Sequence, residues 1–106
     1  MIQFRITPFL QSKEFSLELE DFEPVGGYEQ FLKHVCDYLG ETFLDWYQGI
    51  ESGIGHVTYR GYTLTVYWTD FPFALSFDCQ DEAMAKELKT ALESFFATSS
   101  NPSNSL

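Results

Sequence analysis

The sequence predicts an α+β protein in which an antiparallel sheet of about five to six strands carries two helices on one face. Six short segments alternate apolar and polar residues, which is typical of half-buried strands, and two longer segments repeat apolar residues at helical spacing. The order along the chain is ββαββββα. Because 106 residues suffice for one core, we expect residues 1–97 to form a single domain and residues 98–106 a flexible polar tail.

The N-terminal part predicts a hairpin followed by a helix. Residues 2–7 and residues 15–20 alternate apolar and polar side chains, so each segment presents one face to the core and the other to solvent. Apolar residues then recur every three or four positions from Tyr28 to Leu39, as on one face of a helix. Gly40 is a typical helix stop.

The middle of the chain predicts a third strand over residues 42–50. The side chains that we expect on its core face are Leu44, Trp46 and Ile50. Asp45 and Tyr47 then point away from the core, because successive side chains of a strand lie on opposite faces. A turn is expected over residues 52–55, where two glycines stand close together.

Three more strands follow. Residues 56–59 and residues 62–68 flank the dipeptide Arg60-Gly61, which favours a tight hairpin. Residues 73–77 alternate again and give the last strand.

The second helix is predicted near the C-terminus. Asp78 is a candidate N-cap, because its carboxylate can accept hydrogen bonds from the free amides of the first turn. The apolar stripe of the helix comprises Met84, Leu88, Ala91, Leu92, Phe95 and Phe96. Oppositely charged residues four positions apart are expected to pair on its exposed side.

The composition excludes several classes of protein. The net charge of −10 disfavours direct binding of nucleic acid, since neutralising phosphates requires clustered lysine and arginine. The aromatic content of 18% distinguishes the chain from a disordered acidic tail. No apolar run reaches membrane-spanning length, and the first residues lack the pattern of a signal peptide. We therefore expect a cytoplasmic globular protein that does not bind membranes.

The chemistry-bearing residues do not form a recognisable catalytic or metal-binding pattern. His34 and Cys36 are two positions apart on the predicted helix, so their side chains diverge, and His56 stands alone. Cys36 and Cys79 are expected to be buried free thiols rather than a disulfide. We expect no metal, no cofactor and no enzymatic activity. A small enzyme would need a pocket that encloses paired carboxylates or a histidine with a carboxylate.

The negative charge is concentrated in one part of the chain. Residues 1–13 carry a charge of +2, residues 14–51 a charge of −9, and residues 52–106 a charge of −3. A concentrated acidic surface attracts a cationic partner. The alternative is a solvated acidic face with no partner.

Acidic and aromatic side chains together suggest an interaction surface, because aromatic residues supply contact area and carboxylates meet arginine or lysine. The candidate partner-binding residues are Glu18, Glu20, Asp21, Glu23, Asp45 and Tyr47. Depending on the register of the strands, Tyr59, Tyr62 and Tyr67 join them. The alternative for these aromatic residues is that they belong to the core.

In size, charge and organisation the whole chain resembles the small acidic immunity proteins of bacterial polymorphic toxin and contact-dependent growth inhibition systems. The resemblance is carried by the compact acidic α+β domain, the carboxylates from Glu18 to Glu23, and the run Asp45-Trp46-Tyr47. It implies a cytoplasmic, stoichiometric inhibitor that binds a basic toxin domain, expected to be a nuclease, and blocks its active site. The alternative is a small bacterial adaptor or regulatory module with another partner. A monomer is expected in either case.

Overall fold

A computed structural model gives the structure of residues 2–10, 12–70 and 73–99, and it has the predicted α+β class and the predicted order ββαββββα. The strands are β1 (Gln3–Pro8), β2 (Phe15–Glu20), β3 (Phe43–Gln48), β4 (Ser52–Tyr59), β5 (Tyr62–Asp70) and β6 (Phe73–Cys79). The helices are α1 (Tyr28–Leu39) and α2 (Glu82–Ser99).

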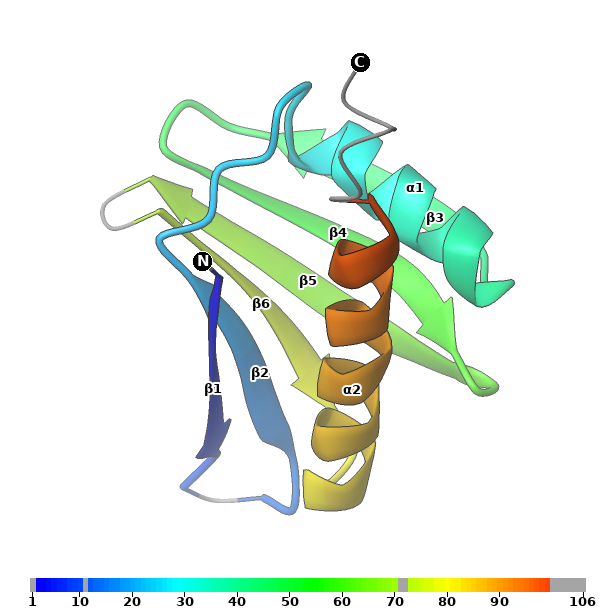
Figure 1. The fold of residues 1–106 in the computed structure, drawn as a ribbon. Coiled ribbons are helices and arrows are strands. Elements are labelled where there is room, and N and C mark those ends of the chain that lie inside the picture. The colour runs from blue at the N-terminus through cyan, green and yellow to red at the C-terminus, as the bar shows by residue number, and fades with distance from the viewer. Residues whose placement is uncertain (1, 11, 71–72, 100–106) are drawn as a thin grey trace.

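The six strands form one antiparallel sheet in the order β1-β2-β6-β5-β4-β3. Both helices lie on the same face of this sheet (Figure 1). The helix α2 contacts β1, β2 and β6, and α1 contacts β3 and β4. The other face of the sheet is covered by neither helix, and we call it the open face.

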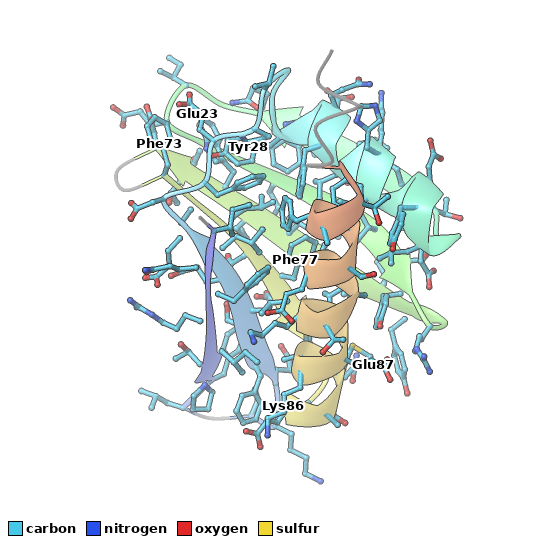
Figure 2. All side chains as sticks on the ribbon, viewed as in Figure 1. Glu23, Tyr28, Phe73, Phe77, Lys86 and Glu87 are labelled. Atoms are coloured by element: carbon cyan, nitrogen blue, oxygen red, sulfur yellow. The ribbon has the colours of Figure 1, made fainter. Side chains whose placement is uncertain are left out.

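The core lies between the sheet and the helices. The register places Leu17, Phe77 and Val66 in one row across β2, β6 and β5, and each of these side chains is at most 1% exposed. Figure 2 shows Phe77 between the sheet and α2. Burying such side chains contributes about 1.5–3 kcal/mol each to folding, so this central row holds the two halves of the sheet together.

An aromatic cluster connects the loop before α1 to both helices. The ring of Phe22 lies 4.7 Å from that of Phe31 on α1, and 5.6 Å from that of Phe96 on α2. The hydroxyl of Tyr28 donates a hydrogen bond to the backbone carbonyl of Phe22, and burial raises the pKa of Tyr28 to about 12. This cluster fixes the start of α1 over the sheet.

The helix α1 has the predicted bounds and is capped by Gly40, as expected. The helix α2 differs at both ends. Its first turn is capped by Asp81, whose carboxylate accepts a hydrogen bond of 2.8 Å from the amide of Met84, and not by Asp78. The prediction for Asp78 was wrong because β6 continues through Cys79 and keeps Asp78 in the sheet.

At its other end α2 continues through Ser99, two residues beyond the predicted domain limit of 97. The remaining residues of the predicted tail, 100–106, lie outside the described residues. Among the described residues, no helix is long and apolar enough to cross a membrane.

The strand β3 contains an irregularity that the alternation did not predict. The register shifts between Phe43 and Asp45, so Leu44 is an extra residue in a bulge. As a result Phe43 and Trp46 pack against the core, whereas Leu44 is 47% exposed. Ile50 follows the strand and is 95% exposed, so the prediction of a core position was wrong for both Leu44 and Ile50.

The predicted turn at residues 52–55 is instead the first half of β4. Its two glycines make room for the indole ring of Trp46 on the neighbouring strand. A Cβ atom on Gly53 would lie 2.8 Å from Trp46 Cζ2, and one on Gly55 would lie 2.6 Å from Trp46 Cε3. The two glycines therefore allow the backbone of β4 to lie directly against the Trp46 ring of β3. The turn itself lies just before them, where the amide of Gly49 donates to the carbonyl of Ser52 at 2.7 Å.

The two cysteines are free and buried, as predicted. Burial raises the pKa of Cys36 to about 11 and that of Cys79 to about 12. The neighbouring carboxylates act in the same direction by a smaller amount. Both groups are therefore protonated thiols near neutral pH, which makes them weak nucleophiles.

We expect Gly53→Ala to lower the free energy of unfolding by about 1–3 kcal/mol, because the added methyl group overlaps the Trp46 ring. Urea denaturation followed by circular dichroism measures the change. In a Trp46→Leu background the same substitution should cost clearly less. An equal cost in the two backgrounds would mean that the indole ring is not the reason for the glycine.

We also expect neither cysteine to react with iodoacetamide in the native protein at about pH 8 within the time that a free thiol is fully alkylated. After unfolding in guanidinium chloride both should react, and mass spectrometry counts the added groups. Rapid native alkylation of Cys36 or Cys79 would contradict the buried positions described above.

Candidate functional site

The open face carries the side chains that alternate with the buried ones on all six strands. One row of paired residues crosses it from β1 to β3, and consists of Arg5, Glu18, Ser76, Tyr67, Ile54 and Tyr47. The row begins with charged groups and ends with aromatic and aliphatic groups. The open face therefore has an acidic side, over β2, and a tyrosine side, over β3 to β5.

The predicted residues Glu18 and Glu20 lie on the open face of β2, as the alternation indicated. They are not free of cationic neighbours, because Arg5 on β1 forms an ion pair with Glu20. Strand pairing brings Arg5 there, and this pairing cannot be inferred from charge along the chain.

Glu18, Glu20 and Asp21 come together around a small depression, which we call the acidic hollow. Its volume is about 130 Å³, and Thr69, Phe73 and Ala74 complete its lining. The small side chain of Ala74 on β6 leaves the space between β2 and β5. The hollow therefore presents three carboxylates, one of which is paired with a guanidinium of the chain.

Glu23 lies beyond this hollow, in the exposed loop before α1. Figure 2 shows Glu23 and Phe73 at the same end of the molecule, and the amide of Phe22 donates to the carbonyl of Phe73 at 3.4 Å. The negative charge of Glu23 acts on Tyr28, whose pKa it helps to raise, although burial is the larger cause. Glu23 thus extends the acidic side without lining the hollow.

Asp45 and Tyr47 lie on β3, at the opposite edge of the sheet from β2. They point to the open face, as predicted. Four strand spacings separate β3 from β2, which is roughly 19 Å. The structure therefore places the six predicted residues on two sides of the molecule and not in one cluster.

His56 is not isolated, in contrast to the expectation from the sequence. Its Nδ1 atom lies 2.7 Å from Oδ1 of Asp45 on the neighbouring strand. The pair is partly buried on the open face. Neither His56 nor Asp45 lines the acidic hollow or the larger depression over β3 to β5. Within residues 2–10, 12–70 and 73–99, no three His, Cys, Asp or Glu side chains gather so that they could hold a metal ion.

A larger depression lies on the tyrosine side, and we call it the tyrosine hollow. It has a volume of about 430 Å³ and is open to solvent. Of its lining residues, those whose side chains share the open face are Tyr47, Ser52, Ile54, Tyr67 and Thr69. Tyr47 is 64% exposed and Tyr67 is 42% exposed, so both rings can meet a partner.

The sequence placed Tyr67 on this face only under one register of the strands, and it placed Ile54 in a turn. The alternation of Gly53, Ile54 and Gly55 was the available indication that Ile54 lies in a strand. Of the other two conditional tyrosines, Tyr59 is buried on the helix side, where its hydroxyl donates to Oε1 of Glu87 at 3.0 Å. Tyr62 is paired with Tyr59 and shares that side.

Thr69 lines both hollows. The acidic hollow and the tyrosine hollow are therefore neighbours on the open face, and together they form what we call the trough. It runs across the strands from Glu20 on β2, past Ala74 and Thr69, to Tyr47 on β3.

Asp78 also lies on the open face, at the other end of β6 from Ala74. Burial, and to a smaller extent the charge of Glu14, raise the pKa of Asp78 above its ordinary value. The fold therefore disfavours the ionised form of this carboxyl, and a cation brought near it by a partner would relieve part of that cost.

Most cations of the chain form ion pairs with carboxylates of the chain itself. Five of the six lysines and arginines form ion pairs among the described residues: Arg5 with Glu20, Lys33 with Glu29, Arg60 with Glu87, Lys86 with Glu82, and Lys89 with Glu93. The three pairs four residues apart on the helices are exposed and stabilise the fold by only a few tenths of a kcal/mol each. The sixth cation, Lys13, stands in the loop between β1 and β2.

Comparison with known proteins yields no relative: no protein-family model, no curated protein and no solved structure matches this chain.

Proposed function

We propose that this protein is a stoichiometric inhibitor that neutralises a basic toxin domain, a nuclease, by covering its cationic surface with the open face. In this proposal the protein acts as a monomer in the bacterial cytoplasm and needs no cofactor. The observation that carries the proposal is the uncovered sheet face, which is acidic on one side and aromatic on the other.

Charge complementarity supports a basic partner. The net charge is −10, and five of the six cations are already paired within the described residues, so the excess negative charge is complementary to a basic partner. Nuclease sites are rich in cations because they hold phosphate groups. An acidic surface can occupy such a site, and its charge also accelerates encounter with the toxin domain.

The tyrosine side supports a protein rather than a small ion as the partner. Tyr47 and Tyr67 offer exposed aromatic area next to carboxylates, and tyrosines of this kind are enriched at the energetic centres of interfaces. Of the described residues, Leu44 on the edge strand and Ile50 in the following turn are also exposed apolar side chains. They would extend the contact beyond the trough.

The binding face is tested by two matched charge reversals. We expect Glu18→Lys/Glu20→Lys to weaken binding of a basic toxin domain encoded beside this gene by about tenfold or more, because like charges then face each other. The control is Glu29→Lys/Asp37→Lys on the outer side of α1, which changes the charge equally and also breaks one ion pair. Isothermal titration calorimetry measures both, and circular dichroism confirms that both variants fold.

The control should bind like the original protein, and inhibition of the toxin should become complete at one equivalent. Equal weakening by both reversals would place the contact elsewhere and contradict the proposal. The absence of any neighbouring toxin gene, together with the absence of a basic protein that co-purifies with the chain, would contradict it as well.

Salt dependence separates an inhibitor of a basic domain from an adaptor with another partner. We expect the association rate to fall steeply between low and physiological ionic strength, because the attraction between exposed charges is screened. Stopped-flow measurements at several salt concentrations give the slope. An association rate that does not change with salt would favour the adaptor.

A further inference from the structure

We infer that the trough binds one arginine side chain of the basic partner, with its methylene stem in the tyrosine hollow and its guanidinium in the acidic hollow. This inference rests on the proposed function, because it names the side chain by which the open face would recognise its partner.

The shape of the trough suits a long side chain that is apolar along its stem and charged at its end. The two hollows adjoin at Thr69, which lines both, so a side chain that crosses this residue can have its stem in one hollow and its charged end in the other. Arginine and lysine place their methylene groups along apolar surface while the charged group stays in a polar environment. Tyr67 and Ile54 supply the apolar surface on one side of Thr69.

The acidic hollow carries more negative charge than the described part of the chain neutralises. Three carboxylates line it, and the described structure gives them one ion pair, between Glu20 and Arg5. Arg5 approaches from β1, whereas Ala74 and Thr69 line the opposite side of the hollow with small side chains. A second guanidinium can therefore enter from the β5 side and approach Glu18 without displacing Arg5.

Two features favour arginine over lysine. Glu18 and Glu20 are two residues apart on one face of β2, about 6.5 Å along the strand, and a planar guanidinium offers several N–H groups that can reach neighbouring carboxylates. The guanidinium and its stem also stack on aromatic rings, and Tyr67 provides such a ring at the tyrosine hollow. A lysine ammonium is a compact, strongly hydrated charge and gains less from either feature.

The inference is tested with two synthetic peptides, hexaarginine and hexalysine, which carry the same charge. Titrations followed by NMR should show tighter binding of hexaarginine, by about threefold or more. The amide shifts should concentrate at Ile54, Tyr67, Thr69 and Ala74. Equal affinity for the two peptides, or shifts distributed over acidic residues of the whole surface such as Asp37 and Glu93, would overturn the inference.

The tyrosine hollow is tested with two substitutions on the same strand. Tyr67→Ala should weaken hexaarginine binding and abolish the preference over hexalysine, because it removes the stacking surface. The control Tyr62→Ala removes a ring of similar exposure from the opposite side of β5 and should leave the preference unchanged. Equal effects of the two substitutions would contradict the assignment of the tyrosine hollow.

The acidic hollow is tested by a substitution that places a lysine side chain in it. Ala74→Lys places a cation of the chain itself in the hollow, and should abolish the arginine preference. Thr63→Lys adds the same charge to the open face near the other end of β5, outside both hollows, and should reduce the affinity for both peptides equally. If the two lysine variants behave alike, the acidic hollow is not the binding site.

The same two lysine variants separate this inference from the proposed function. If the toxin domain is released by the β2 charge reversal but binds Ala74→Lys and Thr63→Lys equally, the proposed function stands and the arginine site fails. If hexaarginine selects the trough but no basic domain binds through β2, the arginine site stands and the inhibitor function fails.

Discussion

The pairing of β6 on both of its edges is the interaction on which the rest of the structure depends. β6 is the last strand in the sequence, yet it lies between the N-terminal hairpin and the β3–β4–β5 meander. Its residues Leu75 and Phe77 are almost completely buried, and they align with buried residues of β2 and β5. Because β6 alternates strictly, the same pairing that buries these side chains places Ala74 and Ser76 on the open face. The small side chains in the middle of the open face therefore alternate along β6 with the large side chains of the core.

The acidic and aromatic sides of the open face come from the two units that β6 joins. The hairpin contributes the carboxylates, and the meander contributes the tyrosines, so the trough exists only after the long-range pairing has formed. This arrangement couples the trough to folding, since loss of the β6 pairing would separate Glu18 from Tyr67 as well as open the core. Pairing across many residues of sequence is also the slow part of folding in sheets of this kind.

Periodicity in the sequence was sufficient to predict the element order and the outward direction of Glu18, Asp45 and Tyr47. It could not predict the strand order, so it did not reveal that Glu18 and Asp45 stand at opposite sides of the sheet. The bulge at Leu44 was also hidden, because one extra residue changes the register without changing the composition of the strand. The two glycines of β4 wrongly indicated a turn. They are glycines because the ring of Trp46 on the neighbouring strand leaves no room for a Cβ atom, and sequence alone does not show this contact.

The bulge in β3 has a consequence for how copies of this protein meet one another. A regular edge strand offers its free amides and carbonyls to another sheet, and extended assemblies grow in that way. At one edge the bulge interrupts the spacing of these groups, and at the other edge β1 ends in Pro8, which has no amide hydrogen to donate. Both edges are thereby poor templates for growth, which disfavours extended assemblies of an acidic protein with an uncovered aromatic face.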